Sequence, residues 1–251
     1  MMDERQTTSG IAAPQCGKYG DKSDVGRSGE RRTQRRPRNQ QHRGWYSRGY
    51  LPHFDVSRGI QHITYRLADS LPRAVLKQMQ ADIEESVRGE DERQTELRRR
   101  IETYLDAGHG SCILQEPQVA ACVIDTWYHF DGERYHLLEW VVMPNHCHVL
   151  IELVEGVALG KIVLSWKNYS ARFINEFKSR TGVRRSQGSQ VWQREYWDRF
   201  IRDERHFEAA KKYIVMNPVN AGFVARPEEW LWSSAKERKK TEFQVSGAAN
   251  A

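Results

Sequence analysis

The chain has 251 residues, with 39 lysines and arginines against 33 aspartates and glutamates and a formal net charge of +6 at pH 7. At about 150 residues per domain, this length predicts one large domain with extensions, and no run approaches the roughly 18 consecutive apolar residues of a membrane helix. The first residues lack the apolar core of a secretory signal, and the four cysteines include no C-x-x-C pair, which argues against a disulfide framework and a cysteine zinc site. We therefore expect a soluble cytoplasmic protein whose basic balance is compatible with a polyanionic partner.

Composition divides the chain into three parts. Residues 1–47 are rich in glycine, serine, glutamine and arginine and contain the basic block ERRTQRRPRNQQHRG, so we expect a disordered basic arm. The arm could be an electrostatic contact for nucleic acid or a solvated tail, and the sequence leaves both open. Residues 237–251 lose periodicity and are expected to form a flexible tail. The expected folded domain is therefore 48–236.

Hydrophobic periodicity predicts the elements of the first half of this domain. Alternating apolar residues predict a strand over 61–67. Apolar residues at steps of three and four predict a helical hairpin over 73–87 and 95–105. Pro117 opens a further predicted helix, and a turn then leads into a predicted strand over 135–142.

The second half continues with a strand, a helix, a strand and a helix. Residues 146–153 are the predicted partner of the preceding strand in a β-hairpin. A long amphipathic helix is predicted over 157–178. A short strand is predicted within the aromatic-rich stretch 191–202. The last helix is expected to begin at Asp203 as N-cap and to be ended by Pro218, because proline disfavours the α conformation of the residue before it.

The sharpest feature of the sequence is the stretch PNHCHVL. Successive side chains of a strand alternate between faces, so His146 and His148 share a face about 7 Å apart and could converge on one metal ion. Cys147 points to the other face. Two imidazoles alone are weak evidence, because an H-x-H pair is more often two ordinary strand residues.

A phenol and an amide lie one turn apart on the last predicted helix. Tyr213 and Asn217 are separated by four residues, so they share a face and could address one point. The alternatives are an ordinary buried tyrosine and a polar helix end before Pro218. Neither residue would indicate a site without further support.

Several stretches together carry a resemblance to a known family: VVMPNHCHVLIE, SWKNYSARFINE, VWQREYWDRFIRDERHFEAAKKYIVMNPVNAGFV and EEWLWSSA. In this order they resemble the REP-associated tyrosine transposases, a branch of the single-tyrosine HUH transposases. The resemblance runs from about Arg48 to Ala235 and leaves out the basic arm. It implies an α+β, ferredoxin-like HUH fold, with helices packed on an antiparallel sheet that carries the H-U-H motif. Cys147 occupies the usually hydrophobic U position, which suits a thiol that packs as a small hydrophobe.

The resemblance also implies roles for particular residues. His146 and His148 match the metal-binding histidines of the family, and Tyr213 matches the catalytic tyrosine. Asn217 stands where related enzymes supply a third polar ligand. The family implies Mg²⁺ or Mn²⁺ and no nucleotide cofactor, although two imidazoles also suit Zn²⁺.

Other residues could contribute to the same site. Tyr169 is the competing nucleophile, but its place on the apolar stripe of its predicted helix favours a core role. Four basic residues could contact phosphates or simply form solvated basic faces: Lys167, Arg172, Lys211 and Lys212. Four aromatic residues could stack on unpaired bases, although most are expected in the core: Trp192, Tyr196, Trp197 and Trp232.

The function implied by the resemblance is transposition. The enzyme would cut and join single-stranded DNA folded as a palindromic hairpin, through a 5′-phosphotyrosine intermediate, and would work with the nucleoid in the cytoplasm and without a membrane. A catalytically silent DNA-hairpin-binding or regulatory protein of the same fold is the main alternative. A metal-dependent hydrolase with water as nucleophile and a structural metal site are two others. The presence of both histidines and the tyrosine favours the enzyme.

Overall fold

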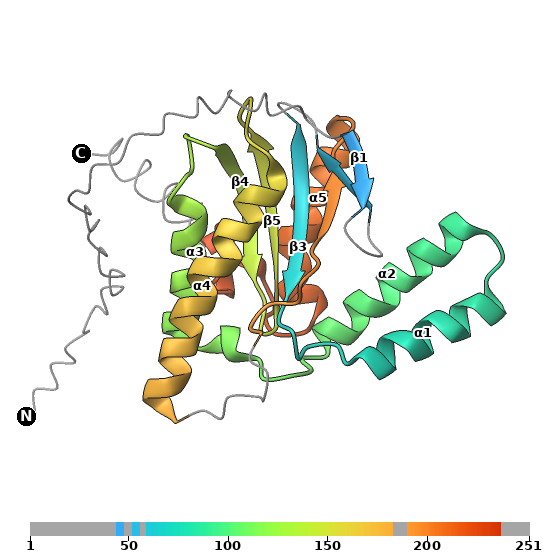
Figure 1. The fold of residues 1–251 in the computed structure, drawn as a ribbon, viewed down its shortest axis with the longest axis horizontal. Helices are drawn as coiled ribbons and strands as arrows, with labels where there is room; N and C mark the ends of the chain where they lie inside the picture. The colour runs from blue at the N-terminus through green and yellow to red at the C-terminus, as the bar shows by residue number, and fades with distance from the viewer. Residues whose placement is uncertain (1–43, 48–51, 56–58, 183–189, 237–251) are drawn as a thin grey trace, which may run out of the picture. The chain divides into compact units, whose positions relative to one another are not determined.

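The computed structural model describes the following parts of the chain: residues 44–47, 52–55, 59–182 and 190–236 (Figure 1). The tail expected at 237–251 lies outside the described residues, as does the arm expected at 1–47 apart from its last four residues. Among the helices of the described residues, none combines the length and the apolar character needed to cross a membrane.

A four-stranded antiparallel sheet forms the centre of the fold (Figure 1). Its strands, in the spatial order β4-β5-β3-β6, are β4 (Tyr135–Val142), β5 (His146–Leu153), β3 (Ile60–Arg66) and β6 (Trp197–Phe200). A separate pairing joins β1 (Gly44–Ser47) to β2 (Pro52–Asp55). The strands predicted over 61–67, 135–142 and 146–153 are therefore confirmed, within one residue at each end.

The chain path through this sheet is the β-α-β-β-α-β path of ferredoxin-like domains. Strand β3 leads through helices to the β4–β5 hairpin, and one further helix leads to β6. Every pair of neighbouring strands is antiparallel. The α+β class expected from the sequence is therefore what the structure has.

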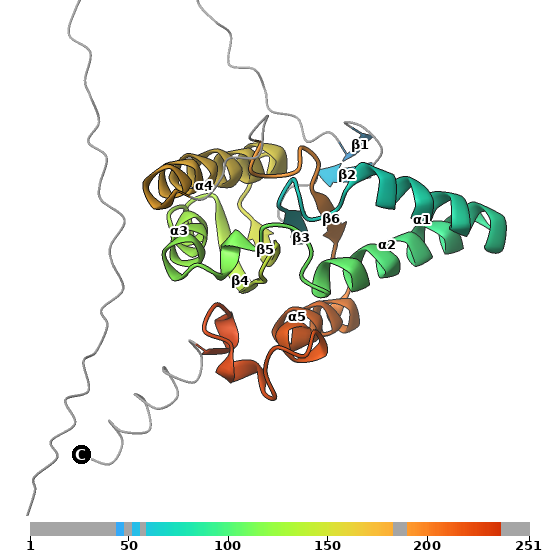
Figure 2. The same cartoon turned by 90° about the horizontal axis from the view of Figure 1, so that it is seen from below.

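Helices cover both faces of the sheet. The main helices are α1 (Arg73–Ser86), α2 (Glu90–Asp106), α3 (Pro117–Tyr128), α4 (Leu159–Thr181) and α5 (Glu204–Asn220), with short 3-10 turns η1 (Ile113–Gln115) and η2 (Pro227–Glu229). Figure 2 shows α3 and α4 side by side on one face and α5 on the other. Helices α1 and α2 form the predicted hairpin, which extends sideways from the sheet (Figure 1).

The alternation of β5 divides its side chains between two hydrophobic cores. Cys147, Val149 and Ile151 face α3 and α4 and belong to the larger core. Leu150 faces the other way, into a smaller core that includes Ile214 of α5. The histidines flanking Cys147 consequently lie on the α5 face. The same alternation that buries Cys147 in the larger core therefore places both histidines on the opposite face of the sheet.

The end of α5 differs from the sequence prediction. Pro218 does not stop the helix but lies inside it, two residues before its last residue, Asn220. The lost N–H bond is offset at the C-terminus, where the amides of Ala221 and Phe223 donate to the carbonyls of Asn217 and Pro218 at 2.9 Å. Asn217 therefore stays helical and keeps its place on the face of the helix that faces the sheet.

Candidate functional site

His146 and His148 lie side by side under α5, as the alternation of β5 predicts. Their ring centroids are 4.8 Å apart, and the residues are 1% and 0% exposed. The strand register sets Arg66 of β3 opposite His146 and Thr64 opposite His148. The two histidines are therefore buried, and their positions are fixed by the pairing of β5 with β3.

Asn145 fixes the tautomer of His146. Its amide nitrogen donates to the carbonyls of Leu105 and His109, at 3.0 and 2.8 Å, and this orientation turns the amide oxygen toward His146. That oxygen lies 2.7 Å from His146 Nδ1, so Nδ1 must carry the proton. The lone pair of His146 Nε2 is then left to face the site, as in many metal-bound histidines.

Residues of strand β3 fix the tautomer of His148 in a similar way. Its Nδ1 lies 2.8 Å from Thr64 Oγ1 and 3.4 Å from His62 Nε2. Its Nε2 is buried and has no hydrogen-bond partner among the described residues. A proton on Nδ1 is used by Thr64, whereas a proton on Nε2 would be buried without an acceptor. His148 therefore also presents an Nε2 lone pair.

Burial keeps these imidazoles neutral. Loss of solvent is the largest cause that lowers the pKa of His146 to about 3, with a smaller contribution from the charge of Arg66. Burial likewise lowers the pKa of His148 well below its ordinary value and that of His62 to about 3. Neutral imidazole is the form that can ligate a metal.

Helix α5 brings Tyr213 and Asn217 to the histidines. The Tyr213 ring centroid lies 5.1 Å from that of His148 and 5.7 Å from that of His62. Asn217 is 1% exposed, and its side-chain oxygen accepts no hydrogen bond from the described residues. The helical spacing that the sequence predicts is therefore present: the Tyr213 ring packs near His148, and the Asn217 side chain is hydrogen-bonded to Tyr213.

Two acidic residues of α2 complete the site, and sequence reasoning missed both. Glu102 is hydrogen-bonded to Tyr213, and Asp106 Oδ1 lies 3.8 Å from His146 Nε2. Burial raises the pKa of Glu102 and raises that of Asp106 to about 6. Burial first, and then these two carboxylates, raise the pKa of Tyr213 above its ordinary value. The available signal was the four-residue spacing of two acids beside the apolar stripe of a predicted helix.

The donors present fit a divalent cation. His148 Nε2 and Asn217 Oδ1 are buried polar atoms with no partner among the described residues, which is unusual unless something else satisfies them. Within those residues, no group of three or more His, Cys, Asp or Glu side chains has metal-binding geometry. Asp106 Oδ1 is a third such atom, and a ligand set of the two imidazoles with the amide oxygen of Asn217 stays a prediction.

The four basic residues expected at phosphates lie in different settings. Lys167 is buried, and its ammonium donates to the carbonyls of Gln193, Arg194 and Glu195 at 2.9 to 3.3 Å. Three carbonyls occupy its three N–H donors, which gives Lys167 a structural role, and its contact with phosphate stays a prediction. The other three are solvent-accessible, Arg172 on α4 and Lys211 and Lys212 on α5.

The aromatic candidates also separate. Tyr169 is 44% exposed, so its expected core role is wrong, and α4 carries it on the face of the sheet opposite to α5 (Figure 2). Trp192 and Tyr196 are core residues at 3% and 6% exposure. Trp197 and Trp232 are partly exposed. Of these residues only Trp197 touches the histidine cluster, with its ring 5.8 Å from that of His62.

Comparisons with known proteins find similar sequences for part of the chain. Residues 128–217 match the sequence model of a family described as "Transposase IS200 like". A REP-associated tyrosine transposase of Escherichia coli (strain K12) is 26% identical over 100 residues, which are 40% of this chain and 54% of the relative. A Haemophilus influenzae protein with a provisional name of the same kind is 26% identical over 106 residues, covering 59% of its length.

A solved structure is also similar. It is titled as a REP-associated tyrosine transposase bound to a REP hairpin, and it aligns with 74% of this chain and 81% of its own at 18% identity and a TM-score of 0.45. The chain spans between half and three fifths of the curated relatives described above.

Proposed function

Since this chain resembles the REP-associated tyrosine transposases, with residues 128–217 matching the IS200-like transposase family, we propose that it cuts and joins single-stranded DNA. The substrate class is DNA folded as a palindromic hairpin, and the nucleophile is Tyr213. The observation that carries the proposal is the approach of a tyrosine to two neutral imidazoles, with ring centroids of Tyr213 and His148 5.1 Å apart.

The chemistry is a phosphoryl transfer to a phenol. The Tyr213 oxygen forms a bond to phosphorus, the bond from phosphorus to the 3′ oxygen breaks, and the products are a 5′-phosphotyrosine and a free 3′-OH. The tyrosyl ester conserves the bond energy, so attack by a 3′-OH on the ester joins strands without ATP. One site therefore supports both cutting and joining.

The surrounding residues prepare this step. Tyr213 is protonated at neutral pH, because burial and the nearby carboxylates raise its pKa. Glu102 is hydrogen-bonded to the hydroxyl and is the acceptor within reach for its proton. His146, His148 and Asn217 would hold a divalent cation, Mg²⁺ or Mn²⁺, which when bound polarises the phosphate and neutralises its charge.

The test is covalent trapping. Labelled hairpin DNA with single-stranded flanks is incubated with the protein and Mg²⁺ or Mn²⁺ and separated by denaturing electrophoresis. The expected result is a labelled band that migrates with the protein and disappears after proteolysis. DNA binding without this band would support the alternative, a catalytically silent hairpin-binding protein. Cleavage without the band would support a hydrolase that uses water.

A further inference from the structure

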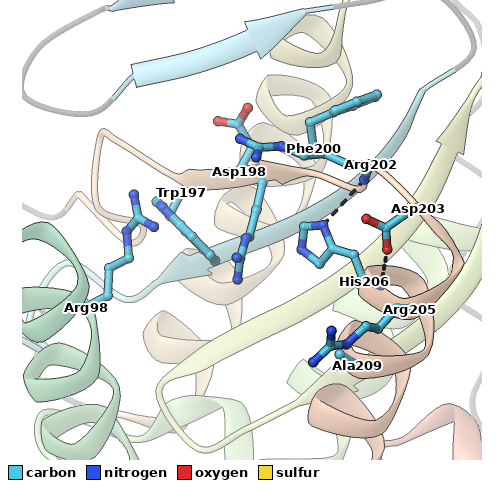
Figure 3. A pocket seen from close by; sticks show the side chains of 10 residues that line it. Arg98, Trp197, Asp198, Phe200, Arg202, Asp203, Arg205, His206 and Ala209 are labelled. Atoms are coloured by element: carbon cyan, nitrogen blue, oxygen red, sulfur yellow. Dashed lines mark hydrogen bonds between the residues drawn. The ribbon is translucent and has the colours of Figure 1, made fainter. Parts of the chain in front are cut away.

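A basic pocket lies beside the site on the same face of the sheet. Its volume is about 450 Å³, and it opens between β6, the start of α5 and one residue of α2 (Figure 3). We call it the arginine pocket and define it by six of its lining residues: Arg98, Trp197, Arg199, Arg202, Arg205 and His206. The pocket shares no residue with the catalytic site proposed above.

The strand register connects the pocket to the histidines. Thr64 pairs with His148 on one side and with Trp197 on the other, so these three residues form one row across the sheet. In the next row, His62 pairs with Arg199. Trp197 is therefore two strand spacings, roughly 10 Å, from His148.

The arginines of the pocket outnumber the two carboxylates that line it, Asp198 and Asp203. None of Arg98, Arg199, Arg202 and Arg205 forms an ion pair with another described residue. Asp203 lines the pocket too, but its Oδ1 accepts the backbone N–H of His206 at 2.7 Å as the cap of α5. The side chains of the arginine pocket thus present several unpaired guanidinium groups in one place.

Arg98 and Trp197 form a cation–π contact at the edge of the pocket. The Arg98 guanidinium stands over the indole at 5.0 Å from its centroid, and Figure 3 shows it directed at Trp197 from α2. An arginine held by its flat face keeps its in-plane N–H groups available for a planar or tetrahedral anion. Burial first and then the charge of Arg199 lower the pKa of Arg98, as expected for cations held close together.

We propose that the arginine pocket binds backbone phosphates of the DNA single strand that runs into the histidine and tyrosine site. The inference rests on the proposed function, because a strand with one phosphodiester at Tyr213 must continue across neighbouring surface. Strand by strand, the sheet leads from His148 through Thr64 to Trp197, and Arg199 lies in the next row. Phosphates along the strand would neutralise guanidinium groups that form no ion pair within the described residues.

The test is a salt titration of binding by the full chain in EDTA, so that no cleavage occurs. The probe is a fluorescent oligothymidylate, and the variant is Arg199→Gln with Arg205→Gln. Each phosphate contact on a single strand contributes about −0.7 to the slope of log affinity against log salt. We expect the variant to bind on the order of tenfold more weakly at low salt, with a slope shallower by about 1.4.

Arg180→Gln is the matched control, because Arg180 is an exposed arginine in the last turn of α4, on the opposite face of the sheet. The control is expected to keep the wild-type slope. A second readout is formation of the Tyr213 adduct, for which the variant should need more DNA for half-saturation and should keep the wild-type rate at saturation.

The outcomes separate the two proposals. Unchanged affinity and slope in the double variant would overturn the pocket assignment, whether or not adducts form. If free phosphate or nucleoside triphosphate inhibits adduct formation while the double variant binds DNA like the wild type, the pocket binds small anions and not the DNA strand. A shallower slope with no adduct on any DNA would leave the pocket standing and overturn the proposed cleavage.

Discussion

In the proposed metal site, His146 presents the lone pair of its Nε2 because neighbouring residues fix the rest of the ring. Asn145 holds one ring nitrogen, and burial holds the ring neutral, with its pKa lowered to about 3. The same logic applies to His148 with Thr64. At this scale, function depends on which atom of a side chain is left without a partner.

Tyr213→Phe should abolish the covalent DNA adduct and leave DNA affinity within about twofold. The variant removes the attacking oxygen and keeps the ring that packs near His148 and His62. Adduct formation is followed on denaturing gels and affinity by anisotropy. Tyr169→Phe is the control and should form adduct at the wild-type rate, because α4 carries Tyr169 on the other face of the sheet. Loss of the adduct in the control alone would move the nucleophile to Tyr169.

Replacing His146 and His148 by alanine should abolish Mn²⁺ binding in calorimetry together with adduct formation. Chelation of the wild type with EDTA should suppress the adduct in the same way. Asn217→Ala should weaken Mn²⁺ binding less, because water can replace a lost carbonyl oxygen. Undiminished adduct in EDTA would contradict a metal role.

At the scale of elements, a buried cation ties α4 to the chain before β6. Lys167 donates to three consecutive carbonyls, those of Gln193, Arg194 and Glu195. This segment leads directly into β6, which carries Trp197 of the arginine pocket. A residue of α4, on the far face of the sheet, therefore helps to position the strand next to the site.

Lys167→Met should destabilise the protein by about 1–3 kcal/mol, because it leaves buried carbonyls without donors. Chemical denaturation measures the free energy of unfolding, and the salt slope of DNA binding is measured in parallel. Lys161→Met, an exposed lysine on the same helix, should change stability little. A normal stability with a shallower salt slope would support Lys167 as a phosphate contact.

The histidines that face α5 should make folding sensitive to acid. The pKa of His62 is lowered to about 3 by burial, from about 6.5, so its neutral form stabilises the fold above pH 6.5. As the pH falls from 6.5 toward 3, the unfolded chain binds the proton first, and stability falls by up to about 1.4 kcal/mol per pH unit.

His62→Gln should therefore flatten the decline of unfolding free energy between pH 6 and pH 4, measured by denaturation in EDTA. Asp106, whose pKa burial raises to about 6, acts in the opposite direction. For this reason the comparison of variant with wild type is the measurement. His129→Gln, at an exposed position, should keep the wild-type decline, and an equal decline in all three proteins would contradict the assignment to His62.

At the scale of the whole molecule, charge lies both in the sheet-side arginine pocket and in the basic block of the N-terminal sequence. Apart from its last residue, Gly44, the block ERRTQRRPRNQQHRG belongs to the part of the chain outside the described residues. It contains no candidate ligand or nucleophile of the site. We therefore expect it to act on affinity and not on chemistry.

Removal of residues 1–44 should weaken DNA binding at low salt and make binding less dependent on salt, because fewer counterions are released from phosphates. The adduct rate at saturating DNA should stay unchanged. Affinity titrations of the full and shortened chains at several salt concentrations provide the measurement. Equal affinities with parallel slopes would show that the arm is not a DNA contact, and a lost adduct would show that the folded domain begins earlier.

The sequence by itself determined most of the strands and helices of this protein and two local pairs of residues, His146 with His148 and Tyr213 with Asn217. Alternation on a strand was enough to put His146 and His148 on one face, and a four-residue step on a helix was enough to align Tyr213 with Asn217. Both are periodicities of local backbone geometry and need no knowledge of the rest of the chain.

Tertiary structure alone decided what surrounds those residues. Glu102 reaches Tyr213 from a helix more than a hundred residues earlier, and Lys167 donates to three carbonyls of the chain before β6. Pro218 lies inside the helix, and the amides of Ala221 and Phe223 after it donate to helix carbonyls. The local preference of proline for ending a helix did not predict this. These features depend on contacts between segments far apart in the sequence, and such contacts are set by the packing of the whole sheet and its helices, which local periodicity does not encode.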